Sequence, residues 1–164
     1  MKIIIAGAYA IGTHLAKLLS RNDQDIVLID EDEERLNNIS NDYDLMTIHS
    51  SPSSIQTLKN AGVQHANLFI GVTPDENMNM NSCILAKALG AKRTVAKVNN
   101  YEFIDEKQKE FFNNLGIDSL IYPENLAARD ITNGLKMSWV RQRWDVHNGA
   151  LIMLGIKLRE TCEI

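Results

Sequence analysis

Residues 2–12 read Lys-Ile-Ile-Ile-Ala-Gly-Ala-Tyr-Ala-Ile-Gly. The apolar run predicts a short strand buried on both faces, and a helical pattern begins directly after it, at Ile11. Gly7 permits a tight turn between the two elements, and Gly12 lets the helix pack closely on the strand. A strand, a glycine loop and a helix N-terminus in this order predict a phosphate-binding site, because the first turn of a helix offers unpaired N–H groups.

Tyr9 stands where a dinucleotide-binding loop normally has its middle glycine, whose bare backbone lets phosphate oxygens approach. Its side chain either points away, which leaves the pocket open, or occupies the phosphate region. A residue with a side chain is also costly there if φ must be positive. We expect the outward orientation, because the rest of the motif is intact.

Short apolar runs alternate with helical patterns along the first 122 residues, which is typical of βαβ units. The predicted strands are Lys2–Ala6, Asp25–Ile29, Leu45–His49, Leu68–Val72, Thr94–Val98 and Ser119–Tyr122. The predicted helices are Ile11–Ser20, Glu31–Ser40, Ser53–Ala61, Glu76–Leu89 and Phe103–Leu115. Six strands and five helices predict an α/β fold with a Rossmann-like, doubly wound parallel sheet over residues 1–123.

The remaining residues predict a different arrangement. Glu124 to Val146 reads as one long helix, so residues 124–147 are expected to form a linker helix. Ala150–Leu158 reads as a new strand, and residues 148–164 are expected to begin a second small domain that is truncated or exchanged with a neighbour. Apolar residues near the end of the helix, Trp139–Trp144 above all, either contact a partner copy in a homodimer or larger homo-oligomer, or fold back on the sheet.

Several polar side chains stand where predicted strands end, at the edge where open α/β sheets bind ligands. An acidic residue at Asp30 accepts hydrogen bonds from ribose hydroxyls and opposes a ribose 2′-phosphate, or it caps the next helix instead. Ser51 and Thr73 either bond the nucleotide or cap the following helices. Lys97 either neutralises phosphate charge or is a solvated strand-end residue.

Composition narrows the function classes. A net charge of −4 argues against a nucleic-acid partner. No apolar run approaches the roughly 20 residues that a membrane span needs, and the N-terminal run is too short for a signal peptide, so no direct membrane insertion is expected. Two cysteines without a metal or redox spacing weakly favour a reducing, cytoplasmic location.

The chain resembles the RCK/KTN family of cytosolic regulators of potassium transport, particularly its Trk-type members. The resemblance rests on stretches in a fixed order, namely residues 5–12, 28–30, 58–63 with 66–67, 71–73 with 79–80, 96–99, and 115–118 with 122–124. It implies binding of NAD(H) or an adenine nucleotide such as ATP, ADP or AMP, and attachment to a membrane potassium-translocating subunit at the inner face of the membrane. It also implies that the nucleotide site is lined by Gly7, Ala8, Tyr9, Ala10, Ile11, Asp30, Ser51 and Thr73, with Lys97 as the phosphate contact. The chain departs from the family at Tyr9 and at Ser50-Ser51, where a Gly-Asp pair is common.

We expect a nucleotide-binding regulatory domain and not an enzyme. A small NAD-dependent oxidoreductase is the first alternative, but the sequence has no Tyr-x-x-x-Lys pair, and its four histidines have no convergent partner. Of these, His49 lies closest to the expected site. A structural dimerisation domain with a decayed nucleotide site is the second alternative, favoured by Tyr9 alone. No G-x-x-x-x-G-K-[ST] motif is present, which excludes a P-loop NTPase.

Overall fold

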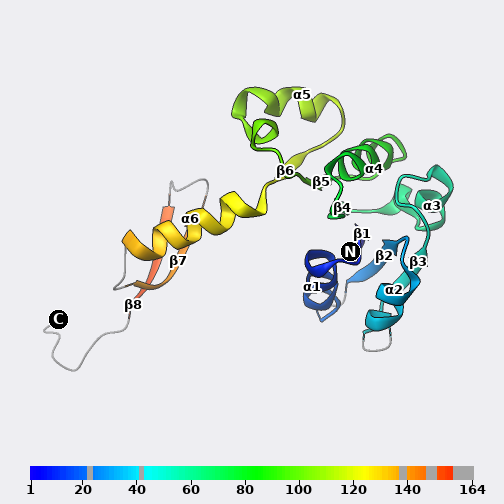
Figure 1. The fold of residues 1–164 in the computed structure, drawn as a ribbon, viewed down its shortest axis with the longest axis horizontal. Helices are drawn as coiled ribbons and strands as arrows, with labels where there is room; N and C mark the ends of the chain where they lie inside the picture. The colour runs from blue at the N-terminus through cyan, green and yellow to red at the C-terminus, as the bar shows by residue number, and fades with distance from the viewer. Residues whose placement is uncertain (22–23, 41–42, 137–139, 147–150, 157–164) are drawn as a thin grey trace, which may run out of the picture. The chain divides into compact units, whose positions relative to one another are not determined.

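The computed structural model describes residues 1–21, 24–40, 43–136, 140–146 and 151–156. Two compact units are present, Met1–Tyr122 and Pro123–Ile164. The first contains a six-stranded sheet in the order β3-β2-β1-β4-β5-β6, in which every neighbouring pair is parallel (Figure 1). Its strands are β1 Lys2–Ala6, β2 Asp25–Asp30, β3 Met46–His49, β4 Leu68–Gly71, β5 Thr94–Lys97 and β6 Ser119–Ile121. The predicted Rossmann-like sheet is confirmed, with strand ends shifted by at most one residue.

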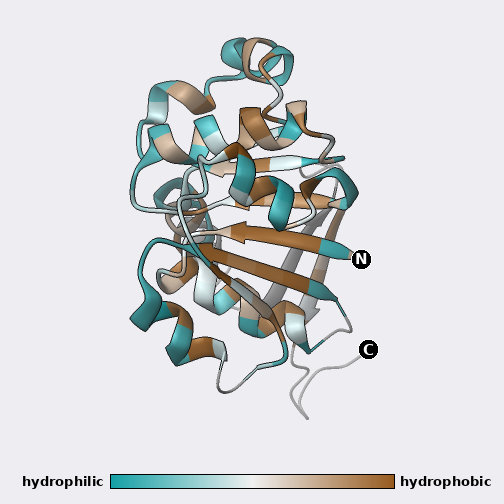
Figure 2. Cartoon of the chain, turned by 90° about the vertical axis from the view of Figure 1, so that its right-hand side faces the viewer, coloured by the Kyte–Doolittle hydropathy of each residue, from teal (hydrophilic) through white to brown (hydrophobic). Residues whose placement is uncertain are grey.

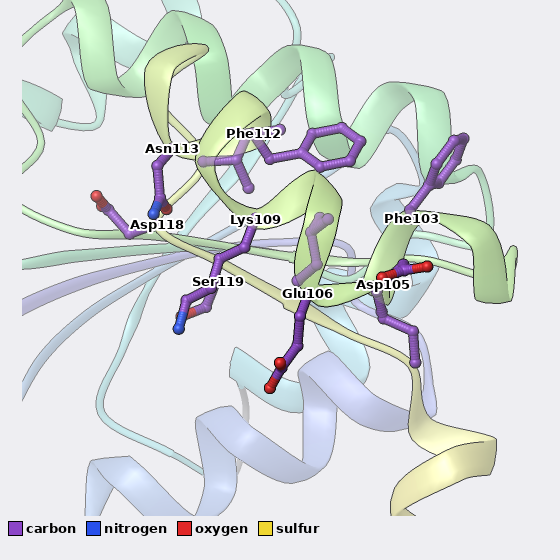
Figure 3. Close-up of a pocket in the computed structure, with 11 residues that line it drawn as sticks. Phe103, Asp105, Glu106, Lys109, Phe112, Asn113, Asp118 and Ser119 are labelled. Carbon is purple, nitrogen blue, oxygen red and sulfur yellow. The ribbon is translucent and has the colours of Figure 1, made fainter.

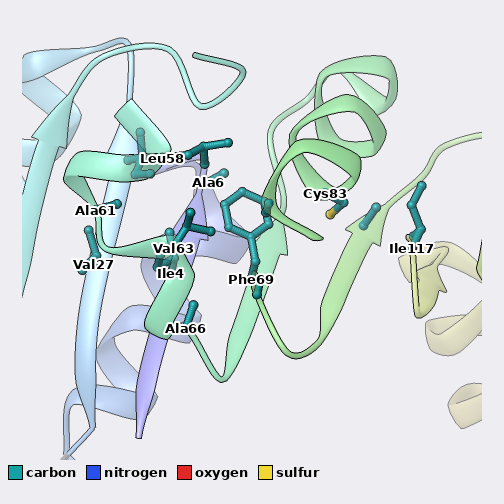
Figure 4. Packing of buried hydrophobic residues seen from close by; sticks show 14 of the residues in the cluster. Ile4, Ala6, Val27, Leu58, Ala61, Val63, Ala66, Phe69, Cys83 and Ile117 are labelled. Carbon is teal, nitrogen blue, oxygen red and sulfur yellow. The ribbon is translucent and has the colours of Figure 1, made fainter. Parts of the chain in front are cut away.

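Helices cover both faces of the sheet, and each face has its own apolar cluster. The α-helices are α1 Ala10–Ser20, α2 Glu33–Ser40, α3 Ile55–Asn60, α4 Glu76–Ala88 and α5 Lys109–Asn114. Residues from α1 and α2 pack with Ile3 and Ile5 on one face. Residues from α3, α4 and α5 pack with Ile4 and Val27 on the other. Figure 4 shows the Phe69 ring in this second cluster, between Ile4 and Cys83.

The central strands form because their side chains are apolar on both faces. Ile3, Ile4 and Ile5 of β1 are at most 2% exposed, and Val27, Leu28 and Ile29 of β2 are fully buried. Figure 2 shows these strands coloured as hydrophobic along most of their length, with hydrophilic residues on the surrounding helices. A strand covered on both sides needs a continuous apolar run, which is the pattern that predicted it.

The helix expected over Phe103–Leu115 is divided into three pieces. Two 3-10 segments, Tyr101–Ile104 and Glu106–Gln108, precede α5. Asp105 separates them with an extended backbone, and its side chain accepts a hydrogen bond from the N–H of Lys107. An aspartate that caps its own downstream turn interrupts a helix, because it satisfies the backbone locally.

The prediction of a continuous helix from Glu124 to Val146 is wrong. Helix α6 spans Pro123–Lys136, and Val140–Val146 form strand β7, which pairs antiparallel with β8, Leu151–Ile156. In β7, Val140, Trp144 and Val146 share one set of alternate positions with Gln142, and the positions between them carry charged residues, which is a period of two and not 3.6. An Asn-Gly pair at residues 148–149 is also typical of a hairpin.

The linker helix expected over 124–147 is therefore wrong in its second half, whereas the further domain expected over 148–164 stays a prediction. Trp139, which we expected at a partner contact, lies outside the described residues, as do residues 147–150 and 157–164. Within the described part of the chain, no helix is long and apolar enough to cross a membrane.

Asp118 joins α4 to the edge of the sheet. Its carboxylate accepts hydrogen bonds from the Lys87 ammonium at 2.7 Å and from the Thr94 N–H at 2.8 Å. Burial raises the pKa of the Asp118 carboxyl, but the hydrogen bonds from Lys87 and Thr94 and the Lys87 charge together outweigh it and hold the pKa below its ordinary value. Asp118 therefore stabilises the fold in its charged form.

We expect this stabilisation to be lost in acid. A group whose pKa is lower in the folded state contributes stability above its unfolded pKa, and that contribution falls as pH drops through the folded value. Asp118→Asn should be less stable than the wild type at pH 7, and the difference should shrink below about pH 4. Urea unfolding from pH 7 to pH 3 measures this, with Glu110→Gln on the exposed side of α5 as control. A pH-independent difference would contradict it.

Candidate nucleotide-binding site

The glycine loop between β1 and α1 lies against the ends of two neighbouring strands. Gly7 has a φ of +110°, and its N–H donates to the carbonyl of Ile29 in β2 at 2.8 Å. A Cβ at Gly7 would lie 2.8 Å from the backbone nitrogen of Thr73, just after β4. Glycine is therefore required at this position by both conformation and space.

Gly12 brings α1 close to the loop. A Cβ at this position would overlap the carbonyl oxygen of Gly7 and would contact the Val72 side chain at 3.3 Å. The close packing that the sequence predicted for the last glycine of the motif is present. It aims the N-terminus of α1 at the region above the carboxyl ends of the strands.

Tyr9 occupies the middle position of the loop without backbone strain. Its φ of −81° and ψ of −176° are extended, so the positive φ that would have made a tyrosine costly is not needed. The ring lies 4.0 Å from the Arg35 guanidinium carbon and is 38% exposed. Tyr9 makes no side-chain capping bond at the start of α1. The described residues also provide no acceptor for the N–H groups of Ala10 and Ile11.

Asp30, at the end of β2, is buried. Its side chain is only 4% exposed, although it stands at the end of a strand. One oxygen, Oδ2, accepts a hydrogen bond from the N–H of Ala8 at 2.6 Å. The other, Oδ1, accepts from the N–H of Asp32 at 2.9 Å. Asp30 therefore holds the glycine loop and the start of α2 together, in addition to facing the site.

Arg35 is a site residue that the sequence analysis missed. Its Nε lies 3.3 Å from Oδ1 of Asp30, and its terminal nitrogen lies 2.9 Å from Oδ2 of Asp32. Among the described residues, no acceptor satisfies hydrogen-bond geometry at this buried Nε. The signal was available, because Arg35 lies in the first turn of α2 and such a side chain can reach back to the end of the preceding strand.

Thr73 and Lys97 are already held by other residues. The Thr73 N–H donates to Oδ1 of Asn79 at 2.8 Å, and its hydroxyl lies 2.8 Å from the same oxygen. Asn79 is fully buried and donates in turn to the carbonyls of Thr73 and Lys97, both at 2.9 Å. The Lys97 ammonium donates to the side chain of Asn99 at 2.7 Å. Asn79 thus fixes the ends of β4 and β5 relative to each other.

The two serines after β3 make local contacts. The Ser51 hydroxyl lies 3.1 Å from that of Ser53, and the Ser50 hydroxyl lies 2.7 Å from that of Thr57. These contacts organise the turn before α3. His49, at the end of β3, has Nε2 at 2.9 Å from the carbonyl oxygen of Glu31.

A cavity of about 190 Å³ lies at the carboxyl ends of the strands. Three predicted site residues line it: Tyr9, Asp30 and Thr73. The other lining residues are Ile29, Glu31, Arg35, Pro52, Pro74, Asp75 and Met78. Gly7, Ala8, Ala10, Ile11, Ser51 and Lys97 are not among them. An apolar floor with a few convergent polar groups is typical of small-molecule sites.

A second cavity, of about 260 Å³, lies between α5 and the edge strand β6 (Figure 3). Its lining combines apolar side chains such as Phe103 and Phe112 with the charged side chains of Glu106 and Lys109. No residue of the predicted nucleotide site lines it. Of these two cavities, the smaller one is the one lined by Tyr9 of the glycine loop and by Asp30.

Comparison with known families agrees with this geometry. The model of the TrkA-N domain matches residues 3–123. The chain belongs to the TrkA-N family. The matched range runs from β1 to the first residue of α6, and it contains every predicted site residue. The resemblance to potassium-transport regulators is confirmed at the level of the family.

Curated relatives of this TrkA-N chain include two proteins named Trk system potassium uptake protein TrkA. The protein of Haemophilus influenzae is 41% identical over 134 residues, which are 80% of this chain and 29% of the relative. The protein of Halomonas elongata is 30% identical over 158 residues, which are 96% of this chain and 35% of the relative. The chain thus spans about a third of the length of these relatives.

Solved structures show the same fold as this TrkA-N chain. The TrkA-N domain of the inner membrane protein ybaL from Escherichia coli has a TM-score of 0.70 at 15% identity, and the match covers 82% of this chain and 96% of that one. The GsuK RCK domain has a TM-score of 0.63 at 25% identity, and the match covers 84% of this chain and 28% of that one.

Proposed function

We propose that the chain is a nucleotide-binding regulatory domain that takes NAD(H) or an adenine nucleotide in the cavity beside Asp30. The observation that supports this most is that Tyr9, the glycine-loop residue at the N-cap of α1, and the buried carboxylate of Asp30 line the same cavity. Structural neighbours are described as the GsuK channel bound to NAD, GsuK bound to ADP, and a Shewanella denitrificans Kef domain in an AMP-bound form.

The residues present fit such a ligand. The two N–H groups without acceptors at the start of α1 suit phosphate oxygens, and the first turn of α1 contains no acidic residue. Pro74 and Met78 provide accessible apolar surface for a base. The buried Nε of Arg35, which lacks a hydrogen-bond acceptor, is a donor that a ligand can satisfy.

We expect NADH to bind and NADPH to bind at least tenfold more weakly. Acidic residues occupy positions 30–34, and Arg35 offsets only one of their charges, so a ribose 2′-phosphate is repelled. Isothermal titration of the chain with NADH, ATP and NADPH measures the difference. Equal affinity for NADH and NADPH would contradict the assignment of Asp30 to the ribose. No binding of any of the three would favour a structural domain with a decayed site.

The proposed role is regulation without catalysis. A ligand that binds one conformation better than another shifts the equilibrium between them and needs no reacting side chain. An oxidoreductase needs a proton-transfer group beside the nicotinamide; the described lining of the cavity contains neither histidine nor lysine, and its tyrosine, Tyr9, stacks on Arg35. NADH oxidation followed at 340 nm with carbonyl substrates distinguishes the two roles.

The proposed partners are a membrane potassium-translocating subunit and further copies of this chain, with the domain at the cytoplasmic side of the membrane. The names of the TrkA relatives support the first partner. Self-association is supported by three apolar side chains on α6 that are at least half exposed, because exposed apolar surface favours contact with another protein surface. They are Leu126, Ile131 and Leu135. Sedimentation at micromolar concentration should show a dimer or larger species, and a monomer would contradict self-association.

A further inference from the structure

The hydrogen bonds and the ion pair of Asp30 leave few positions on its carboxylate oxygens where a ligand can donate a hydrogen bond. A carboxylate has about four acceptor positions, two on each oxygen. On Oδ1, the Asp32 N–H takes one position, and the Nε of Arg35 lies 3.3 Å away on the same oxygen. On Oδ2, the N–H of Ala8 is the one donor among the described residues. Hydrogen bonds therefore leave one acceptor position open on each oxygen, but the Nε of Arg35 lies close to the open position on Oδ1.

Arg35 holds its place beside Oδ1 by charge and by its neighbours. Its Nε has no acceptor with hydrogen-bond geometry in the described structure, so its contact with Asp30 is ionic. A second ion pair, to Asp32, ties the far end of the guanidinium. The Arg35 side chain is 33% exposed, so nothing in the core prevents it from moving outward. A contact on the guanidinium face would oppose this movement and keep Arg35 beside Asp30.

Tyr9 provides that contact. Its ring lies against the guanidinium at 4.0 Å, which is the distance of a close cation–π stack. Both residues line the cavity together with Asp30. A glycine at the middle loop position would leave the guanidinium without this stacking surface. Having Tyr9 in place of the usual glycine therefore affects Arg35, which lies beside the Asp30 carboxylate.

We propose, building on the nucleotide-binding function proposed above, that Tyr9 positions Arg35 against Oδ1 of Asp30 and so restricts Asp30 to one hydroxyl of the ribose. An acidic residue at the end of the second strand can ordinarily accept both the 2′- and the 3′-hydroxyl. In this chain, Arg35 occupies the position beside Oδ1 that the second hydroxyl would otherwise take. Tyr9 is thus a positioning residue, and Arg35 determines which sugars the site distinguishes.

The restriction predicts a specific selectivity. When Asp30 accepts a single hydroxyl, removing that hydroxyl from the ligand costs one charge-assisted hydrogen bond, and removing the other costs little. When Arg35 is released from Oδ1, both hydroxyls are bound and both become necessary. A ligand with both hydroxyls should also bind more tightly, by about tenfold for one added hydrogen bond to a charged group.

Isothermal titration with ATP, 2′-deoxy-ATP and 3′-deoxy-ATP tests the proposal. For the wild type, one deoxynucleotide should bind about tenfold more weakly than ATP and the other within about twofold of it. For Tyr9→Gly, ATP should bind about tenfold more tightly than to the wild type, and both deoxynucleotides about tenfold more weakly than ATP. Arg35→Met, which keeps the apolar stem without the charge, should also discriminate against both.

Tyr9→Phe is the matched control, because it keeps the ring that stacks on Arg35 and should retain the wild-type selectivity. Thermal melts confirm that each variant is folded. Equal dependence on both hydroxyls in the wild type would overturn the proposal, as would a Tyr9→Gly variant with unchanged affinity and selectivity. If the wild type binds ATP but depends equally on both hydroxyls, the nucleotide-binding function still holds. If neither the wild type nor any variant binds ATP, that function fails as well.

Discussion

Gly12→Ala should lower the free energy of unfolding by about 3 kcal/mol or more, the largest effect that we expect from a single added methyl group in this chain. A Cβ at this position would overlap the carbonyl oxygen of Gly7. Neither atom can rotate away, because the backbone fixes the position of both. Relief requires α1 to move off β1, which separates buried residues such as Ala16 from the sheet. Urea unfolding followed by far-ultraviolet circular dichroism measures the loss.

Gly134→Ala is the matched control. Gly134 lies in α6, and nothing is within 4 Å of a Cβ placed there. Alanine is favoured over glycine in a helix by about 0.5–1 kcal/mol, so this variant should be as stable as the wild type or slightly more stable. If Gly12→Ala were as stable as Gly134→Ala, the structure would be wrong in placing α1 so close to the glycine loop.

Asp30→Ala should affect both binding and stability. For binding, the variant loses a charge-assisted hydrogen bond to the ribose, so the affinity for NADH and ATP should fall by about tenfold to a hundredfold. For stability, the N–H of Ala8 loses its acceptor, and Ala8 is only 4% exposed. An unsatisfied buried donor costs about 1–3 kcal/mol. Isothermal titration and urea unfolding measure the two effects separately.

Glu33→Ala removes the same charge from the same acidic run and serves as the control. Glu33 is exposed in the first turn of α2 and does not line the cavity. We expect a loss of a few tenths of a kcal/mol in stability and unchanged nucleotide affinity. If Asp30→Ala lost stability but bound NADH as well as the wild type, Asp30 would be a structural cap alone.

The sheet could be predicted from the sequence because its strands are buried on both faces. Runs such as Ile26–Ile29 must be continuously apolar in that position, and few other structures require such a pattern in four residues. Gly7 and Gly12 could be placed for a similar reason, since each role depends on the absence of a side chain. Both roles are local to the βα turn, so no distant residue was needed to infer them.

What could not be predicted depends on contacts between distant residues. The burial of Asp30 follows from the N–H of Ala8 and from Arg35, which lie in other elements. The position of the Tyr9 ring is likewise decided by Arg35. Strand β7 was misread because the apolar residues Ile131, Leu135 and Trp139 follow one another at a spacing of four, which is typical of a helical face and was extended to Val146. Its pairing with β8 decides the structure, and pairing is not a property of one segment.

Backbone amide NMR of the isotopically labelled chain, titrated with ATP, tests the location of the nucleotide site most directly. The account predicts that the largest chemical-shift changes occur at Ala10 and Ile11 in the first turn of α1, and at Asp30 and Thr73 beside the cavity. Amides of the second cavity, between α5 and β6, should stay unchanged. Shifts confined to that second cavity, or no shifts at millimolar ATP, would contradict the proposal that this glycine loop binds a nucleotide.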